Sequence, residues 1–240
     1  MEQTPVQLQH KKYRISYISK ETPDVSLFRF QACDATKVTF EPGMFMMLEY
    51  SDGTSISRAY SIASAPQQDF LEFIIGLVHG QFTSHLDTAK LGDEYYITGP
   101  YGQFYFSPET EKRALFLAGG TGISPFLSML REIRILGSDT DACMIYSARY
   151  PNEIIRRAEL EELSRQMNFK LNITITRPQP GDGWTGPTGH IDADMIKRLV
   201  PDYAQRTTYI CGPLVFAKAM KDALMSIGVP ESSIKADIWG

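Results

Sequence analysis

The sequence has few cysteines and no long apolar run. Its 240 residues include only Cys33, Cys143 and Cys211, which are odd in number and widely separated. This pattern argues against a disulfide framework and a paired-cysteine zinc site, and three thiolates are too few for an iron–sulfur cluster. No segment approaches the ~18 consecutive apolar residues that span a bilayer, and the polar start lacks a signal-peptide pattern. We therefore expect a cytoplasmic protein with no membrane span and no bound metal.

Neither sign of charge dominates the chain. The 24 Lys and Arg residues against 28 Asp and Glu residues give a net charge of −4. This balance argues against a dedicated nucleic-acid binder, because phosphate binding depends largely on clustered cations. Hydrophobic residues at 43% and charged residues at 22% are typical of a globular protein, and the length suits one large domain or two of ordinary size.

The hydrophobic pattern changes near residue 107. Before it, short segments rich in Val, Ile, Phe and Tyr are separated by turn residues, which predicts an antiparallel β-barrel. The predicted strands cover 13–20, 25–31, 44–50, 59–63, 71–78 and 94–97. A short helix is predicted to start near residue 83. After a polar linker, strands at 114–118, 142–148, 170–176, 208–211 and 234–238 alternate with helices at 124–136, 153–166, 192–200 and 214–226. Such alternation predicts a doubly wound parallel α/β sheet. We therefore predict two domains, 1–107 and 108–240.

The strongest motif of the second half is Ala118–Pro125, which follows a predicted strand and opens a predicted helix. Its glycines allow close approach of the backbone to a ligand, and the free N–H groups of a helix start favour phosphate. Ser124 is the predicted N-cap, and Pro125 suits the first helical turn. The loop matches neither GxGxxG nor a Walker A loop, so a glycine-rich turn without a ligand is the alternative.

Four further motifs are ambiguous when each is taken alone. Arg58–Ser61 combines an arginine, an aromatic ring and a hydroxyl, which can bind phosphate and a flat ring. Gly80–Thr83 could hold another phosphate, and Gly99–Phe104 could be a simple turn. Tyr209–Pro213 ends a predicted parallel strand, where α/β sheets bind ligands, although its cysteine could equally be a small buried hydrophobe.

In this order the five motifs resemble those of the ferredoxin–NADP reductase family, in which an FAD-binding β-barrel precedes a nicotinamide-nucleotide domain. The resemblance runs from about Tyr13 to Ile238 and rests on the RxYS, GxxS/T, GPYGxF, GGTGIxP and CGP motifs. It implies an enzyme, a flavoprotein reductase that takes hydride from NADPH or NADH onto a firmly held FAD.

The same resemblance assigns the expected site residues. Arg58 would contact the FAD phosphates, Tyr60 would pack on the flavin ring, and Ser61 would bond near flavin N5. The expected FAD contacts are Arg58, Ala59, Tyr60, Ser61, Ile74, Ile75, Gly76, Gly80, Gln81, Phe82 and Thr83. The expected nucleotide contacts are Gly120, Thr121, Gly122, Ser147, Arg149, Cys211, Gly212 and Pro213, with Ser61 and Cys211 nearest to the hydride transfer.

Two of these assignments stay open at the level of the sequence. Arg149 either pairs with a 2′-phosphate, which would mean NADPH, or is a solvated surface residue, so the choice between NADPH and NADH is undecided. Trp239 either covers one flavin face or packs at the domain boundary. Arg156 and Arg157 could also reach the nucleotide, although a solvated helix face explains them more simply.

The resemblance implies a separate electron acceptor, such as a ferredoxin, an oxygenase component or a haem protein, because the chain carries no cluster motif. One alternative is a reductase of free flavin, quinone or another small molecule. Another is a non-catalytic subunit that holds FAD or nucleotide inside a complex. The basic run His10–Lys12 with Arg14 could dock an acidic partner, but a frayed, solvated terminus explains it more simply.

Overall fold

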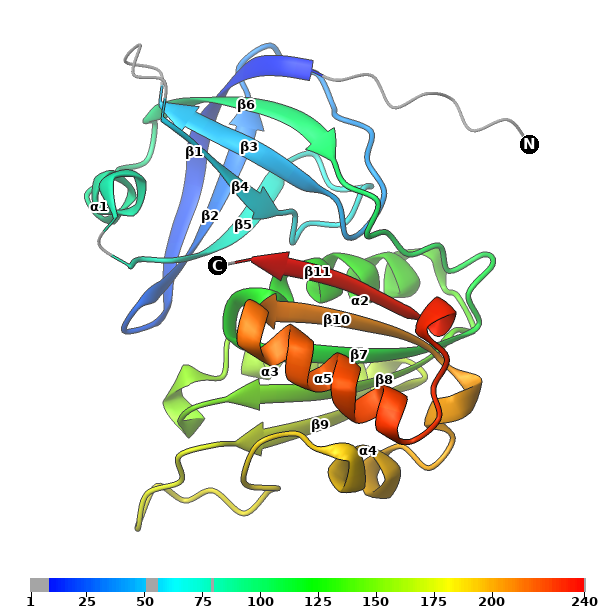
Figure 1. The fold of residues 1–240 in the computed structure, drawn as a ribbon. Helices are drawn as coiled ribbons and strands as arrows, with labels where there is room; N and C mark the ends of the chain where they lie inside the picture. The colour runs from blue at the N-terminus through cyan, green and yellow to red at the C-terminus, as the bar shows by residue number, and fades with distance from the viewer. Residues whose placement is uncertain (1–8, 51–55, 79, 240) are drawn as a thin grey trace. The chain divides into compact units, whose positions relative to one another are not determined.

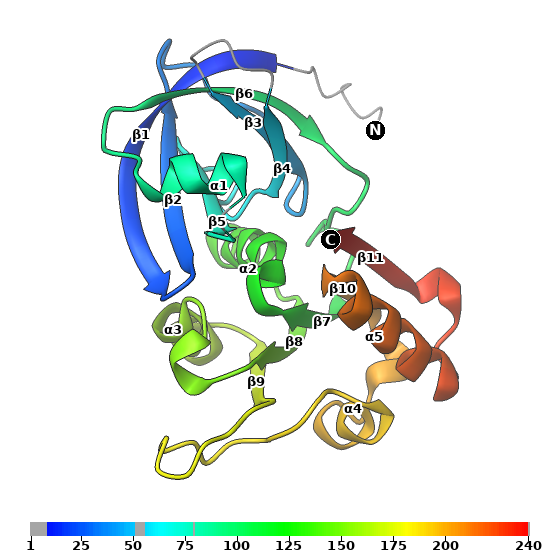
Figure 2. The ribbon, with the colours of Figure 1, turned by 60° about the vertical axis from the view of Figure 1, so that its left-hand side comes forward.

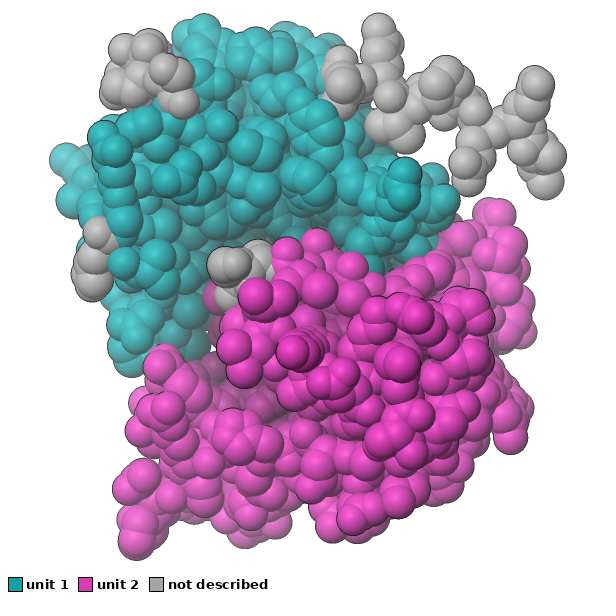
Figure 3. Space-filling view, in the orientation of Figure 1, with its two compact units in different colours: residues 1–106, 127–132 teal, residues 107–126, 133–240 magenta. Residues whose placement is uncertain are grey.

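The structure is a computed structural model that describes residues 9–50, 56–78 and 80–239 (Figure 1). The chain divides into two compact units, residues 1–106 with 127–132 and residues 107–126 with 133–240 (Figure 3). Within the described ranges, no helix is long and apolar enough to cross a membrane. The same ranges hold no cluster of three or more His, Cys, Asp or Glu side chains arranged to bind a metal ion.

The described part of the first unit is built on an antiparallel sheet. Its elements are β1 (Gln9–Thr22), β2 (Val25–Ala32), β3 (Phe45–Tyr50), β4 (Ser57–Ser61), β5 (Leu71–Gly76), α1 (Gln81–Asp87) and β6 (Glu94–Tyr101). The strand order is β4-β3-β6-β1-β2-β5. The two strands at the ends of this order, β4 and β5, also contact each other, so the sheet curls into a barrel.

The barrel core follows from strand periodicity. In β3, Met46, Leu48 and Tyr50 are buried while the residues between them are half-buried, as the two-residue period of a strand requires. Aromatic rings fill the interior, where Phe30 meets Phe73 and Tyr95 edge to face. The barrel therefore has a packed core, and the two strands at the ends of the strand order, β4 and β5, keep backbone groups at their outer edges.

The second unit is built on a parallel sheet with the strand order β11-β10-β7-β8-β9 in its described residues. Its strands are β7 (Arg113–Gly119), β8 (Asp141–Ala148), β9 (Phe169–Ile175), β10 (Thr207–Pro213) and β11 (Ile234–Trp239). Its helices are α3 (Arg157–Gln166), α4 (Ala193–Leu199) and α5 (Leu214–Ser226), together with the two ends of α2 (Ser124–Leu136), whose residues 127–132 belong to the first unit. Short 3-10 turns lie at Gly120–Ile123, Pro151–Glu153, Tyr203–Gln205 and Glu231–Ser233.

Helices lie on both faces of this parallel sheet (Figure 2). One face packs on α4 and α5 in a cluster that includes Leu115, Ile145, Met195 and Met220. Side chains of the same strands that point the other way are also buried; Phe116, for example, stacks on Phe126 at the start of α2. Both parts of the predicted fold class, an antiparallel barrel followed by a doubly wound parallel sheet, are confirmed.

Several element boundaries differ from the sequence-based expectation. β4 covers 57–61 rather than 59–63, because Ser61 already faces Phe45, the first residue of its partner strand β3. α3 begins at Arg157 rather than at 153, because Arg156 adopts a left-handed backbone with φ of 53° that ends the preceding turn. Gly99, placed by the sequence in a turn, lies inside β6.

The basic N-terminal run is also ordered differently from the prediction. Instead of fraying, residues 9–14 pair with β6. Lys11 forms an ion pair with Asp34, while Lys12 and Arg14 both approach Glu94. The cations of this run are therefore partly neutralised, so the run offers a weaker docking patch than its sequence suggests.

Candidate cofactor sites

The Arg58–Ser61 motif lies on β4, at one edge of the barrel sheet. Arg58 and Ala59 are exposed, and Tyr60 and Ser61 are half-buried. Among the described residues Arg58 forms no ion pair, and its guanidinium donates a hydrogen bond to the neighbouring Ser57 carbonyl at 2.8 Å. A guanidinium held on an edge strand in this way suits a phosphate, for which it provides several donors.

Tyr60 has the chemistry of a neutral stacking residue. Its ring lies 5.9 Å from the ring of Phe82, tilted by 36°. Burial raises the pKa of the Tyr60 phenol, and the positive charge of Arg58 opposes that rise only in part. The phenol therefore stays protonated at physiological pH and can donate a hydrogen bond while its ring face packs on a flat group.

The second expected flavin segment, Ile74–Gly76, lies at the other end of the strand order. β5 pairs with β2 on one side, and its remaining edge comes into contact with β4. The side chains of Ile74 and Ile75 are buried, so this segment can offer a ligand only its backbone. Two edge strands that meet in this way provide both the side chains and the backbone groups that the FAD assignment requires.

The Gly80–Thr83 motif begins helix α1. Thr83 is buried, and its hydroxyl accepts a hydrogen bond from the Gly80 N–H at 3.0 Å and donates to the Gly80 carbonyl at 3.2 Å. The Tyr50 hydroxyl donates to the Phe82 carbonyl at 2.6 Å, and the two rings stack with centroids 4.6 Å apart. Gln81 is exposed at the start of the helix. Thr83 therefore shapes the turn, which leaves ligand contacts here to the backbone and to Gln81.

The glycine loop and the Cys211–Pro213 segment come together in the second unit. A Cβ atom on Gly122 would lie 2.2 Å from the Cys211 carbonyl oxygen and 2.8 Å from the Gly212 nitrogen, so only glycine allows this approach. Gly120 has a φ of +56°, and a Cβ there would meet open space. The loop therefore packs on one side against the end of β10 and is open at Gly120.

The contact between Gly122 and the end of β10 lies where the strand order of the sheet reverses. From β7 the chain moves outward through β8 and β9 and then returns to place β10 on the other side of β7. The strand order thus reverses between β7 and β10, and open α/β sheets bind ligands beyond the carboxyl ends of the strands at that point. Gly119 ends β7 and Pro213 ends β10, so both motifs lie at the topological switch point.

The entrance to helix α2 differs from the prediction. The predicted N-cap, Ser124, is already helical, and its hydroxyl donates to the Thr121 carbonyl at 2.8 Å. A 3-10 turn over Gly120–Ile123 precedes the helix, and Pro125 follows in its first turn as expected. The Tyr146 hydroxyl donates to the Gly120 carbonyl at 3.1 Å, which fixes the loop from β8. Thr121 is half-exposed on this turn.

The expected adenosine end of the nucleotide site lies after β8. Ser147 is half-buried opposite Gly119, and the exposed Arg149 donates to both carboxylate oxygens of Glu153, at 2.8 and 3.0 Å. Glu153 and Asp182 line a depression of about 340 Å³ with Tyr150, Pro151, Asn152 and Gln179. Hydrogen bonds from the backbone N–H groups of Gln179 and Trp184 lower the pKa of Asp182, so the depression holds the Asp182 carboxylate beside the Arg149–Glu153 ion pair.

The other predicted site residues lie at the end of the parallel sheet and around the start of α3. Cys211 is fully buried, and its thiol lies 3.9 Å from the Asp237 carboxylate. The backbone of Trp239 pairs with Pro213, whereas its side chain lies outside the described residues. Arg157 pairs with Glu161 on the exposed face of α3, as a solvated helix face would have it, whereas Arg156 precedes the helix and forms a partly buried ion pair with Glu159.

The sequence reasoning missed a buried ionic cluster beside the Arg58–Ser61 motif. Glu72, in the apolar strand β5, is fully buried and pairs with Arg29 and Arg131. A single carboxylate within Leu71–Gly76 is the signal that could have revealed it, because an acidic residue in a buried strand needs a partner.

Known families and proteins match this arrangement. The family described as "Oxidoreductase FAD-binding domain" matches residues 12–106, and the family described as "Oxidoreductase NAD-binding domain" matches residues 116–222. The glycine betaine monooxygenase reductase subunit of Chromohalobacter salexigens is 33% identical over 229 residues, which are 93% of this chain and 62% of that protein.

Two further proteins extend the comparison. A component of the Na⁺-translocating NADH-quinone reductase of Psychrobacter arcticus is 31% identical over 82% of this chain and 52% of its own length. The chain thus spans between about half and two thirds of these two relatives. The solved cytochrome b5 reductase domain of Ulva prolifera nitrate reductase is 26% identical with a TM-score of 0.85, over 95% of this chain and 97% of that chain.

Proposed function

Since this chain belongs to the ferredoxin–NADP reductase family of oxidoreductases with an FAD-binding and an NAD-binding domain, we propose that it is an NADH-dependent flavoprotein reductase. The observation that carries this proposal is the contact of the glycine loop with Cys211 and Gly212 at the topological switch point. That contact assembles two separate motifs where a nucleotide binds in such sheets.

The first unit supplies the FAD contacts. Arg58 would bind the FAD phosphates, Tyr60 would pack its ring on the isoalloxazine and Ser61 would donate a hydrogen bond near the reacting end of the flavin. Backbone groups of Ile74–Gly76 and of the Gly80–Thr83 turn complete the site. Support comes from the exposure of Arg58 and from the two edge strands that meet at this place. Together these contacts hold FAD as a resident group.

The second unit supplies the nucleotide contacts. The backbone N–H groups of Gly120, Thr121 and Gly122 would bind the nucleotide, with Thr121 near its nicotinamide end, and Cys211, Gly212 and Pro213 would form the wall beside the nicotinamide. When bound, the two cofactors supply the chemistry, a hydride transfer from nicotinamide C4 to flavin N5. The residues contribute binding, orientation and exclusion of water. Ser61 and Cys211 are the side chains that we place nearest to the transferred hydride.

The charge around Arg149 favours NADH over NADPH. Glu153 already engages the Arg149 guanidinium through two hydrogen bonds. A 2′-phosphate at this position would compete with Glu153 for Arg149 and would meet the second carboxylate, that of Asp182. The name of the Psychrobacter arcticus relative, which belongs to an NADH-quinone reductase, agrees with this choice.

Glu153→Gln is therefore expected to shift the nucleotide preference. Loss of the Glu153 charge frees the Arg149 guanidinium to bind the 2′-phosphate of NADPH. One added hydrogen bond between charged groups should raise kcat/KM for NADPH, relative to that for NADH, about tenfold. Steady-state kinetics with both nucleotides measures that ratio. The matched control is Glu161→Gln, which removes the partner of Arg157 on the neighbouring helix α3. An equal shift in both variants, or in neither, contradicts the assignment.

We further propose that the electrons leave to a separate acceptor, with an oxygenase component as the leading candidate. This rests on the Chromohalobacter salexigens relative, which is a monooxygenase reductase subunit. The quinone reductase relative favours a quinone as the second candidate. Rates of NADH oxidation with a ferredoxin, with a soluble quinone and with free FMN distinguish these acceptors. If the protein is yellow but NADH does not reduce its flavin, and it oxidises NADH with none of these acceptors, it is instead a binding subunit.

A further inference from the structure

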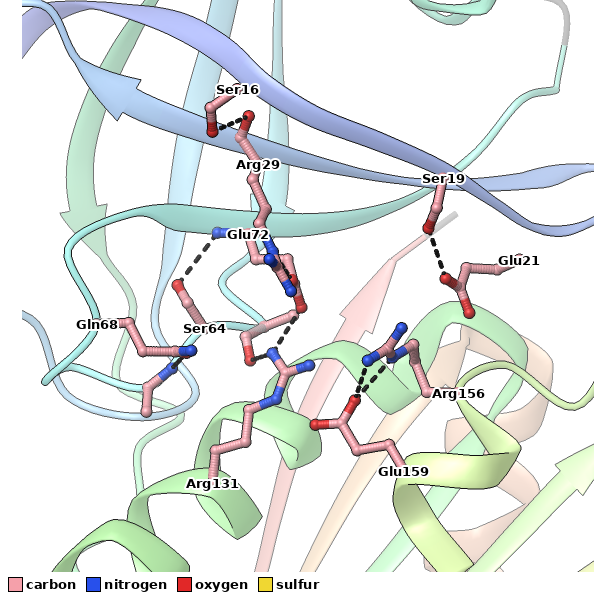
Figure 4. A network of polar contacts seen from close by, with 12 residues as sticks. Ser16, Ser19, Glu21, Arg29, Ser64, Gln68, Glu72, Arg131, Arg156 and Glu159 are labelled. Atoms are coloured by element: carbon pink, nitrogen blue, oxygen red, sulfur yellow. Dashed lines mark hydrogen bonds and ion pairs between the residues drawn. The ribbon is translucent and has the colours of Figure 1, made fainter. Parts of the chain in front are cut away.

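The buried ionic cluster beside the flavin motif is built around Glu72 (Figure 4). Its carboxylate accepts from Arg29 Nε at 2.7 Å and from an Arg131 guanidinium nitrogen at 2.6 Å. Arg131 itself is only 8% exposed. The three side chains come from β2, β5 and α2, and all belong to the first unit.

The same cluster binds the backbone that follows Arg58–Ser61. The Arg131 guanidinium donates to the Ala63 carbonyl at 2.7 Å, and the Ser128 hydroxyl donates to the Ser64 carbonyl at 2.7 Å. Glu72 acts on this segment as well, because its N–H donates to the Ser64 hydroxyl and its carbonyl accepts from the Ala63 N–H. Each hydrogen-bonding group lies on a buried residue, so the segment is held without competition from water.

Such a cluster is a costly way to hold a strand. A buried ion pair adds little net stability compared with apolar side chains of the same volume, because both charges must be desolvated. What the cluster does provide is a fixed orientation of the carbonyl that it binds, because the donors of a guanidinium lie in one rigid plane. The fixed carbonyl of Ala63 lies two residues after Ser61 in the chain. The cluster therefore restricts the backbone from which Tyr60 and Ser61 project.

We propose that Arg131, oriented by Glu72, is a positioning residue for flavin reduction. By holding the Ala63 carbonyl, it sets the direction in which Ser61 and Tyr60 face the FAD. This inference rests on the proposed function, since it assigns Arg131 a role at the FAD site proposed above. The guanidinium acts through the backbone and touches neither cofactor in this account.

Replacement of Arg131 tests the role. In Arg131→Met, we expect the limiting rate of flavin reduction by NADH to fall roughly tenfold or more in stopped flow, because small misplacements of reacting groups are costly. The NADH concentration for half-saturation should stay near the wild-type value, and the visible circular dichroism of bound FAD should change. Arg131→Lys, which keeps the charge, should recover part of the rate. A merely structural role would lower thermal stability without these spectroscopic and kinetic changes.

The matched control is Arg206→Met in the second unit. Arg206 is equally buried, pairs with Asp141 and Asp202 and donates to the Ala114 carbonyl at the start of β7. This variant should lose stability and keep the wild-type limiting rate and flavin circular dichroism. If Arg131→Met does not fold, Ser128→Ala, which removes only the hydrogen bond to the Ser64 carbonyl, should still slow reduction about threefold.

The outcomes distinguish the proposed reductase function from the positioning role of Arg131. Wild-type protein that does not retain FAD, or is not reduced by NADH, contradicts the proposed function. The positioning role alone is overturned if the wild type is reduced normally and both Arg131→Met and Ser128→Ala keep its rate and flavin spectrum. A slower Arg206→Met variant also overturns it, because the effect would then follow from lost stability.

Discussion

Replacing Arg58 with alanine should deprive the protein of most of its FAD. Arg58 is exposed on edge strand β4, and in the described residues its side chain makes no ion pair that supports the fold. Its removal should therefore leave the barrel intact while one charge-assisted phosphate contact is lost. Such contacts contribute about 1.5–3 kcal/mol each, which corresponds to roughly a tenfold to hundredfold weaker FAD affinity.

The affinity of the apoprotein for FAD, measured by flavin fluorescence quenching, tests this expectation. Arg14→Ala provides the control, since Arg14 is also an exposed arginine of the first unit and makes only a 3.6 Å contact with Glu94. We expect Arg14→Ala to bind FAD like the wild type. Equal affinities of all three proteins for FAD would remove Arg58 from the phosphate site.

Gly122→Ala should abolish most nucleotide binding and leave the FAD bound. The added methyl group would lie 2.2 Å from the Cys211 carbonyl oxygen, a separation that forces either the loop or the end of β10 to move. Both belong to the proposed nucleotide site, and a displacement of about 1 Å can cost roughly a hundredfold in rate. The FAD contacts should be preserved because they lie in the first unit.

Anaerobic titration with NADH and the dependence of the reduction rate on NADH concentration measure this effect. The control is Gly137→Ala at the C-terminal end of α2, the helix that follows the loop; there φ is +61° and an added Cβ meets open space. That variant should lose about 1 kcal/mol of stability through backbone strain and reduce its flavin normally. Wild-type NADH affinity in Gly122→Ala would show that the loop does not hold the nucleotide.

The architecture was predictable because each half repeats one pattern. Alternating burial in strands such as β3 marks the barrel, and strands alternating with helices mark the parallel sheet. The meeting of the glycine loop with Cys211 was also within reach, because both follow parallel strands and such strand ends share one edge of the sheet. The sequence could not give the strand order, and hence the switch point, because strand order depends on contacts between distant residues.

The missed features also depend on partners that are distant in the chain. β4 ends at Ser61 because β3 begins at Phe45, although the apolar residues that follow suggest a longer strand. Residues 9–14 are ordered by pairing with β6, 80 to 90 positions further along the chain. Glu72 and Arg131 are 59 positions apart. No local pattern connects them, and only the fold shows that Glu72 and Arg131 bind the backbone of Ala63 and the hydroxyl of Ser64.

We propose that this chain holds FAD and reduces it with NADH. The most direct test is the visible absorption spectrum of the purified protein reconstituted with FAD, followed by anaerobic addition of NADH and, separately, NADPH. We expect one bound flavin per chain, bleached by about one equivalent of NADH and more slowly by NADPH. A protein that binds no flavin, or whose bound flavin keeps its oxidised spectrum with both nucleotides, would contradict it.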